Sequence, residues 1–511
     1  MSASREKKQR QGGTSADRQM TAQQKEAAAR RKTIQYTVIG VIVAIAVAAL
    51  LIWNSGIFQR MAARNAVALT IGEHTYSPAE VSYYYYGNST YQMYLSYGLI
   101  SSGVDLRETA YPGSETEQTW HDYLVESATE TLTQVSAVLD EAAAEGYTLS
   151  EEGQQTLQSN IDSMKESASN SGYSYSTYLR LVYGDYMTTE AFESCLEQQV
   201  LVNEYGTQWA EAQEISASDI ETYYQENANT LDTFHYSAYT ISGAAESTTD
   251  EDGNTVEPTD EESEAAMEEA RQGAEQLAAA LEAGEDVTDL VDELGATTNE
   301  DASATGSSLS STYSEWLTDV TRQAGDVTVL ESGTNVYVVV FNSREDYREV
   351  DNYLPANVRH IFIQAEVDEG ASSPTDEQMA AAKTEAEDLL AQWQAGDATA
   401  ESFAALAEEY SDDTGSNTNG GLYEGITKST SFIANFIDWT FADGRQVGDT
   451  GIVENTTSGG YHVMYLDSYG DTPVWETSIR TTLQSEALTA HLDEITANYT
   501  ATQGDGMKYV G

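Results

Sequence analysis

The sequence predicts an α+β protein with an N-terminal transmembrane helix, a helical region, and two units that each hold an antiparallel sheet flanked by helices. Three observations lead to this fold class. A charge-free apolar stretch stands near the start of the 511-residue chain, long amphipathic stretches follow it, and one pattern then occurs twice. The roughly 450 residues beyond the apolar stretch are enough for about three domains.

Residues 34–53 are predicted to form the transmembrane helix. They read IQYTVIGVIVAIAVAALLIW, twenty residues without a charge, and this length suits the roughly 30 Å of a bilayer's hydrocarbon core. Residues 1–33 carry nine Lys and Arg against three Asp and Glu, which predicts a cytoplasmic basic tail because positive charge beside a span stays inside. We therefore expect a single-pass protein of the cell membrane, with a cytoplasmic N-terminus and an extracytoplasmic bulk.

A cleaved signal peptide is the alternative for this stretch. The apolar core of a signal peptide is usually shorter and ends in a small-x-small site, whereas this one ends in Leu-Leu-Ile-Trp. The basic region before it is also long, and no Cys stands directly after it to accept a lipid. We therefore expect an uncleaved anchor.

The chain beyond residue 53 is strongly acidic. It holds 15 of the 24 Lys and Arg but 81 of the 84 Asp and Glu, which gives 15 − 81, or about −66. Such a surface keeps a protein soluble and repels nucleic acid, so nucleic acid is not expected as a partner. The single cysteine, Cys195, rules out an intramolecular disulfide and stands in a helical pattern that predicts a core position.

Residues 66–232 are predicted to be mostly helical. The region opens with a short hairpin, ALTIGEHTYSP, and continues with amphipathic stretches such as TWHDYLVESATETLTQVSAVLDEAAAEG, which ends at a Gly. The run Tyr83-Tyr84-Tyr85-Tyr86 is expected to pack in a core, with the lining of a groove as the alternative. Residues 474–500 are predicted to form one amphipathic helix that docks back onto this region.

Two segments, 233–348 and 357–470, repeat one pattern. Trp316 and Trp439 each stand six residues before Arg-Gln-x-Gly-Asp, and each copy then ends in an apolar strand closed by Asn-Ser or Asp-Ser. Upstream, each copy has an opening strand (HYSAYTI and VRHIFIQ), a long helix and a second short helix. This order predicts an antiparallel sheet flanked by helices in each copy.

The second copy holds the residues with the strongest chemical signal. The sequence contains no HExxH, CxxC or GxSxG and no phosphate-binding Gly loop, so no metal or cofactor is expected. Three polar residues are present in the second copy and missing from the first: His360, Asp413 and His462, opposite Tyr236 or Ser237, Thr297 and Tyr337. Their joint presence in one copy and joint absence from the other predict a site.

At these residues the second copy resembles the parvulin-type peptidyl-prolyl isomerases. Four consecutive blocks carry the resemblance over nearly all of 357–470: VRHIFI, SFAALAEEYSDDTGSNTNGGLY, FIANFIDWTF and GDTGIVENTTSGGYHVMYL. They resemble the opening strand, the second helix with its loop, the helix of the pocket aromatics, and the closing strands. The resemblance implies a parvulin fold and the cis/trans isomerisation of X–Pro bonds.

The resemblance also implies roles for individual residues. His360 and His462 correspond to the paired histidines beneath the pocket. Asp413 takes a place that is Cys in some parvulins and Asp in the extracellular foldase group. The substrate-binding wall for the proline ring is expected to consist of Leu422, Phe432 and Phe436, with Phe441 behind them. Two departures are that the usual GGDLG appears as Gly-Gly-Leu-Tyr-Glu, one residue short, and that Phe432 replaces the more usual Met.

The other regions carry weaker resemblances. The first copy, 233–348, resembles a degenerate parvulin that has lost the site, and 66–232 with the tail helix is similar to the chaperone core of the PrsA and SurA foldases. Together these imply a membrane-anchored extracytoplasmic foldase whose partners are unfolded or partly folded exported polypeptides with X–Pro bonds. Two alternatives remain: a holdase chaperone without useful catalysis, and a cell-surface scaffold protein.

Overall fold

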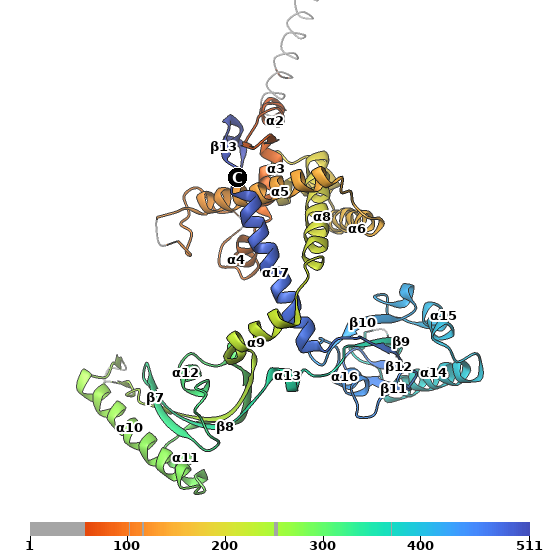
Figure 1. Cartoon of the computed structure of the whole chain (residues 1–511). Helices are drawn as coiled ribbons and strands as arrows, with labels where there is room; N and C mark the ends of the chain where they lie inside the picture. The colour runs from red at the N-terminus through yellow and green to blue at the C-terminus, as the bar shows by residue number, and fades with distance from the viewer. Residues whose placement is uncertain (1–46, 48–56, 102, 115–116, 250–253, 369) are drawn as a thin grey trace, which may run out of the picture. The chain divides into compact units, whose positions relative to one another are not determined.

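The computed structural model describes residues 47, 57–101, 103–114, 117–249, 254–368 and 370–511. The predicted basic tail and, apart from Val47, the predicted membrane span lie outside these residues. Within the described part of the chain, no helix is both long and apolar enough to cross a membrane. The chain divides into two compact units, Met1–Ala212 with Leu488–Gly511, and Gln213–Ala487 (Figure 1).

The first unit is largely helical. Its helices are α2 (Ile57–Arg64), α3 (Pro78–Tyr86), α4 (Ser89–Ser96), α5 (Trp120–Glu145), α6 (Glu151–Asn170), α7 (Tyr175–Tyr183) and α8 (Thr189–Glu211). Thr119 begins α5 with a capping box, and Gly146 ends it at φ 71°, a left-handed conformation that glycine adopts at little cost. The predicted hairpin forms β1 (Leu69–Ile71) and β2 (His74–Tyr76).

The end of the chain completes the core of this unit. Helix α17 (Val474–Thr496) begins in the second unit and ends in the first, and the strand β13 (Ala501–Gln503) then pairs antiparallel with β1. Val510 is fully buried in the same cluster as Trp120 and Tyr85. In the tyrosine run, Tyr83 and Tyr85 are buried and their two neighbours are partly buried. Cys195 is buried as well, and burial raises the pKa of its thiol.

The second unit begins with α9 (Ala217–Leu231) and contains the two repeats. In the first copy the strands are β3 (Thr233–Ser242), β6 (Thr297–Thr305), β7 (Val327–Ser332) and β8 (Asn335–Glu345), in the order β6-β3-β8-β7. Its helices are α10 (Asp260–Glu282), α11 (Thr288–Glu293) and α12 (Ser314–Leu317), and the small hairpin β4 (Thr248–Thr249) and β5 (Thr255–Val256) precedes α10. Helix α13 (Tyr347–Val350) leads to the second copy.

The second copy has the same sheet order. Its strands β9 (Ala356–Gln364), β10 (Leu422–Ile426), β11 (Thr450–Asn455) and β12 (Gly460–Tyr469) lie in the order β10-β9-β12-β11. Its helices are α14 (Asp376–Ala395), α15 (Ala400–Tyr410) and α16 (Ala434–Thr440). All neighbouring strands in both sheets are antiparallel. The predicted α+β class, with a helical region and two antiparallel sheets flanked by helices, is therefore confirmed for the described residues.

Strand pairing corrects one residue equivalence between the copies. His360 pairs with Met464 on β12, and the corresponding partner on β8, Val339, pairs with Ala238. Counting along the sequence had placed Tyr236 or Ser237 there. The bulges do not cause the difference, because each copy has one at the same place, where Asn342 on β8 and Asp467 on β12 have no partner. The opening strands HYSAYTI and VRHIFIQ are instead offset by one residue from the alignment that the sequence suggests.

The copies also differ between the second short helix and the edge strand. In the second copy, eleven residues (411–421) separate α15 from β10, and Asp413 lies in this loop. In the first copy, β6 starts at Thr297, soon after α11, and Thr297 is already paired with Thr240. The first copy therefore has no loop in which a counterpart of Asp413 could lie.

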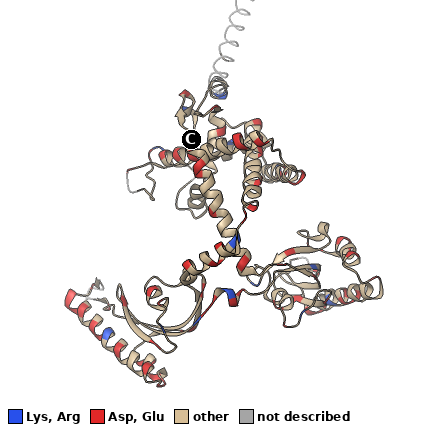
Figure 2. Ribbon diagram, viewed as in Figure 1, with Lys and Arg blue, Asp and Glu red and all other residues tan. Residues whose placement is uncertain are grey.

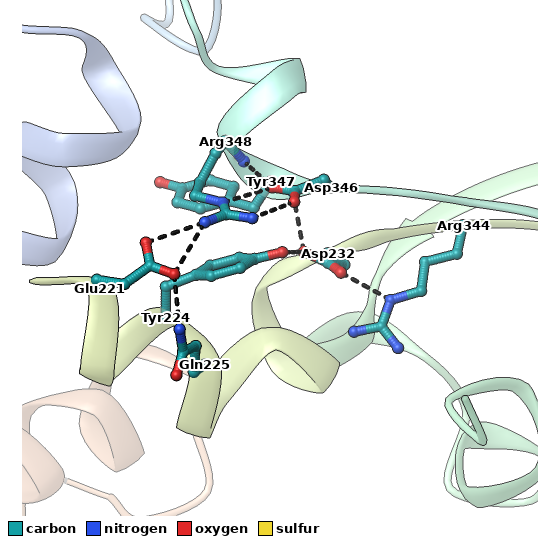
Figure 3. A network of polar contacts seen from close by, with 8 residues as sticks. All are labelled: Glu221, Tyr224, Gln225, Asp232, Arg344, Asp346, Tyr347 and Arg348. Atoms are coloured by element: carbon teal, nitrogen blue, oxygen red, sulfur yellow. Dashed lines mark hydrogen bonds and ion pairs between the residues drawn. The ribbon is translucent and has the colours of Figure 1, made fainter.

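A buried carboxylate joins the two ends of the first copy. Asp232 accepts hydrogen bonds from Arg344 Nε at 2.7 Å, from Tyr224 Oη at 2.9 Å and from the backbone N–H of Tyr347 at 2.9 Å (Figure 3). Arg348 lies 4.0 Å over the Tyr224 ring. Asp232 precedes β3, and its partners Arg344 and Tyr347 lie at the end of β8 and just beyond it, so these contacts hold the entry and the exit of the first copy together.

Candidate active site

The two histidines of the second copy face each other across neighbouring strands. His360 lies on β9 and His462 on β12, where His462 is paired with Phe362, so the two imidazoles are diagonal neighbours on one face of the sheet. Their Nδ1 atoms are 2.9 Å apart. The residues are 3% and 8% exposed, which places this polar contact in a dry environment.

Asp413 extends the pair into a chain of three polar residues. Its Oδ2 lies 3.0 Å from His360 Nε2, and it accepts hydrogen bonds from Ser416 Oγ at 2.5 Å and Tyr423 Oη at 3.1 Å. The backbone N–H of Gly415 donates to Oδ1 at 3.2 Å. These donors fix the carboxylate and satisfy it in a partly buried position.

Asn455 determines which ring nitrogens carry protons. Its Oδ1 accepts from the backbone N–H groups of Thr457 and Ser458 at 3.0 and 2.9 Å, so its Nδ2 donates to His462 Nε2 at 3.1 Å. His462 then carries its proton on Nδ1 and donates it to His360 Nδ1. His360 in turn donates from Nε2 to Asp413. The hydrogen bonds therefore run in one direction, from Asn455 to the carboxylate.

The electrostatics agree with this direction. Burial lowers the pKa of His462 to about 3, and the adjacent His360 ring adds to the effect. The hydrogen bond from His360 is the main cause that holds the pKa of Asp413 well below its usual range. At neutral pH, His462 is therefore neutral and Asp413 is ionised.

An aromatic cavity of about 270 Å³ lies against this chain. Phe432 and Phe436 stand 4.9 Å apart between ring centroids, Tyr423 meets Phe432 at 5.0 Å, and Phe362 stacks on His462 at 4.7 Å. The cavity is lined by His360, Phe362, Asp413, Tyr423, Ser431, Phe432, Ile433, Phe436, Asn455, Ser458 and His462. Its walls are therefore apolar ring faces on one side and the hydrogen-bonded residues His462, His360 and Asp413 on the other.

The structure brings five of the seven predicted site residues into this lining. They are His360, Asp413, His462, Phe432 and Phe436. Leu422 does not line the cavity, because side chains alternate along β10 and its neighbour Tyr423 takes the inward position. Phe441 follows α16, packs on Tyr353 at 5.2 Å between ring centroids, and belongs to the same apolar cluster as Phe436.

The sequence alone did not identify the residues that orient the hydrogen-bond chain. Asn455 stands in the hairpin segment Glu-Asn-Thr-Thr-Ser-Gly-Gly before His462, and Ser416 stands three residues after Asp413. The one-residue deletion in the Gly-Gly-Leu-Tyr segment was the available signal for Tyr423, because it shifts the alternation of β10 by one position.

The first copy holds no comparable chain among its described residues. The equivalents of His360 and His462 are Ala238 and Tyr337, given the strand pairing and the matching bonds Gly325 N→Phe341 O and Gly448 N→Leu466 O. Tyr236 and Tyr313 pack at 5.4 Å, with their hydroxyls 3.4 Å apart, in the cluster that also contains Ala238. In the first copy, aromatic rings therefore lie in the region that corresponds to the polar site of the second copy.

Comparisons with known proteins agree with the site. Residues 342–468 match the family of PPIC-type PPIASE domains. No curated protein matches the chain. Among solved structures, PrsA from Bacillus subtilis is 12% identical with a TM-score of 0.29, over 77% of this chain and 91% of that one. The foldase protein PrsA from Streptococcus pneumoniae is 12% identical with a TM-score of 0.28, over 78% and 97%.

A third structure, the peptidylprolyl isomerase PrsA from Bacillus anthracis, is 19% identical with a TM-score of 0.19 over 29% of this chain, which spans 59% of that one. The assignment rests on the family match and on the paired histidines that lie within it. The second copy, which makes up most of residues 342–468, is a PPIC-type peptidyl-prolyl isomerase domain, so the chain contains an isomerase domain of the parvulin type.

Proposed function

We propose that the chain is a membrane-anchored, extracytoplasmic foldase, which acts as a peptidyl-prolyl cis/trans isomerase and a chaperone for exported proteins. The observation that carries this proposal is the buried hydrogen-bond chain of His462, His360 and Asp413 against an aromatic cavity. The anchor rests on the charge-free stretch 34–53 and the basic residues before it. The partners are unfolded or partly folded exported polypeptides with X–Pro bonds.

The chemistry requires no nucleophile. An X–Pro bond has a rotational barrier of roughly 18–20 kcal/mol because amide conjugation is lost in the twisted state. Phe432, Phe436 and Tyr423 hold the proline ring by burying apolar surface. The planar amide is more polar than the twisted one, so a site with little water favours the twisted state.

The polar chain gives this cavity a defined electrostatic side. Asp413 is ionised and held by three side-chain donors, while His462 stays neutral. The site therefore carries its one negative charge at a fixed position beside the proline pocket, and no Lys or Arg lines the cavity. This supports a reaction on neutral X–Pro segments and gives no means of recognising an acidic residue before proline.

A two-part experiment tests the proposal. The full chain should speed the cis/trans relaxation of a short Ala-Pro peptide and suppress aggregation of an unfolded exported protein. In cells, it should remain in the membrane fraction after a salt wash and be digested by protease added from outside. Aggregation suppression without faster relaxation would favour the holdase alternative, and loss of both activities would leave the scaffold alternative.

A further inference from the structure

The loop that carries Asp413 is fastened to β9 at both of its ends. At its first end, the side chains of Ser411 and Asp412 accept hydrogen bonds from backbone N–H groups of β9 at 3.0 and 2.9 Å. At its far end, the backbone N–H of His360 donates to the Gly421 carbonyl at 2.8 Å. Asp413 lies between these ends, so its distance from the His360 ring depends on both of them.

Arg359 makes the side-chain contact at the far end of this loop. Its Nη1 donates to the carbonyls of Asn419 at 3.3 Å and Gly420 at 3.1 Å. These carbonyls stand directly before Gly421, whose φ of 70° lets the backbone run so close to β9 that a Cβ there would collide with the His360 carbonyl oxygen. The guanidinium therefore holds the loop where it packs against the backbone of the histidine.

A bulge in β12 orients Arg359. Asp467 has no partner on β9, because the register shifts between Leu466 and Ser468. Its Oδ1 accepts from Arg359 Nε at 2.8 Å, and the side chains of Asp467 and Arg359 are 22% and 18% exposed. One edge of the guanidinium thus bonds the sheet while Nη1 reaches the loop, which the planar arrangement of its donors allows.

Carboxylates that could pair with an arginine are abundant in this chain. Asp and Glu are spread over most of the described elements, whereas Lys and Arg are few (Figure 2). Arg359 nevertheless directs part of its guanidinium at two backbone carbonyls. Such contacts fix the position of a backbone segment, which pairing with a mobile surface carboxylate does not.

The first copy shows what replaces this pair where the site is absent. The strand pairing places Ser237 and Asn342 at the positions of Arg359 and Asp467. Asn342 is likewise the unpaired residue of the bulge, and its Nδ2 lies 3.4 Å from Ser237 Oγ. Both copies therefore have the bulge and a contact across it, but the Arg–Asp pair occurs in the copy that also has the loop.

We propose that Arg359, oriented by Asp467, is a positioning residue for the isomerisation. It fixes the far end of the loop and so keeps Asp413 within hydrogen-bonding distance of His360. Neither Arg359 nor Asp467 lines the cavity, so the pair acts through Asp413 and does not touch the substrate. Loss of the pair should leave the aromatic walls in place and lower the rate at which bound substrate reacts.

The test compares Arg359→Gln with Arg445→Gln in the full chain. Arg445 is a matched control because its side chain is also 18% exposed, donates to the Trp439 carbonyl and pairs with Asp449. Arg359→Gln should lower kcat about five-fold with KM nearly unchanged, whereas Arg445→Gln should keep both. In proton NMR, the His360 Nε2–H, which the bond to a carboxylate shifts downfield, should move upfield in Arg359→Gln alone.

Asp467→Ala removes the support of Arg359 and should move both readouts in the same direction, with no further loss when it is combined with Arg359→Gln. A circular dichroism melt verifies folding, and Asp467→Ala carries the test alone if Arg359→Gln does not fold. A loss of activity with an unmoved His360 proton, or an equal loss in Arg445→Gln, would overturn the proposal. The proton signal reports the loop position even in a chain without isomerase activity, so failure of that activity and failure of the positioning role are distinguishable.

Discussion

His360 and His462 meet through their Nδ1 atoms at 2.9 Å, so one ring must donate and the other must accept. Asn455 donates to His462 Nε2 and so sets the direction of the hydrogen bonds between the histidines. Asp413 ends the chain of hydrogen bonds by accepting from His360 Nε2. The site is thus one connected set, and a change at its far end alters the proton positions beside the substrate cavity.

Asn455→Asp should break the hydrogen bond between the two histidines. A carboxylate at this position accepts from His462 Nε2, so His462 Nδ1 loses its proton and the two Nδ1 atoms no longer form a donor–acceptor pair. We expect at least a ten-fold loss of isomerase activity, because one buried hydrogen bond is worth about 1 kcal/mol and the chain contains two that depend on it. The ¹⁵N chemical shifts of the imidazoles report the tautomer, and unchanged shifts would refute the assignment.

Acid should destabilise the second copy before it reaches the ordinary carboxylate range. His462 has a pKa of about 3 when folded, against 6.5 for an ordinary histidine. Between these values the unfolded chain binds a proton that the folded domain does not, so stability is present above about pH 6.5 and falls as the pH drops towards 3. Below about pH 4, protonation of Asp413 in the unfolded chain adds to the loss, because its folded pKa is lowered.

The expected loss is a few kcal/mol at most, and hydrogen exchange of β9 and β12 amides, corrected for intrinsic rates, measures it. His462→Gln cannot gain the proton and should flatten the dependence between pH 6.5 and 4. An equally steep dependence in this variant would show that another group is responsible.

Tyr423→Phe should reduce isomerase activity while the aromatic ring stays on the cavity wall. The substitution keeps the ring and removes the hydroxyl that donates to Asp413 Oδ2. We expect a several-fold fall in kcat with KM nearly unchanged, since one donor to a charged group contributes about 1.5–3 kcal/mol in a buried site and less in a partly exposed one. Tyr469→Phe removes a hydroxyl bonded to the Arg445 carbonyl outside the cavity and is the control. Equal effects of both would contradict a special role of Tyr423.

Asp232→Asn should destabilise the first copy. The side chain of Asp232 is 4% exposed and pairs with Arg344, so the substitution leaves a partly buried guanidinium without its counter-charge. The expected cost is about 3 kcal/mol in urea denaturation. Asp326→Asn removes a more exposed carboxylate that lies 3.6 Å from Arg322 in the same copy and should cost less than about 1 kcal/mol. Similar costs for the two would contradict the role assigned to Asp232.

The helices and sheets could be predicted from the sequence where a pattern is repeated or strongly periodic. The two Trp–Arg-Gln-x-Gly-Asp segments identify two copies of one sheet, and both sheets have the same strand order. Positions that depend on register could not be read in this way. Ala238 rather than Tyr236 or Ser237 aligns with His360, because the two opening strands are offset by one residue from the sequence alignment, and only the strand pairing reveals this offset.

The same limit applies to the site. His360, His462 and Asp413 were predictable because the first copy lacks them, and the structure places them within hydrogen-bonding distance. Leu422 was expected on the cavity wall, but Tyr423 is there, because the side on which a strand residue lies depends on pairing with β9. Asn455 acts through an amide orientation that is set by two backbone N–H groups of its own turn, which only coordinates reveal.

We infer that the hydrogen-bond chain of His360, His462 and Asp413 makes this domain a working isomerase. Exchange NMR on an Ala-Pro peptide measures it most directly, with the full chain at catalytic concentration and Asp413→Ala as the comparison. We expect faster cis/trans exchange with the wild type and a 10- to 100-fold smaller acceleration with the variant, corresponding to about 1.5–3 kcal/mol for the lost charged hydrogen bond. No acceleration by the wild type, or equal acceleration by both, would contradict it.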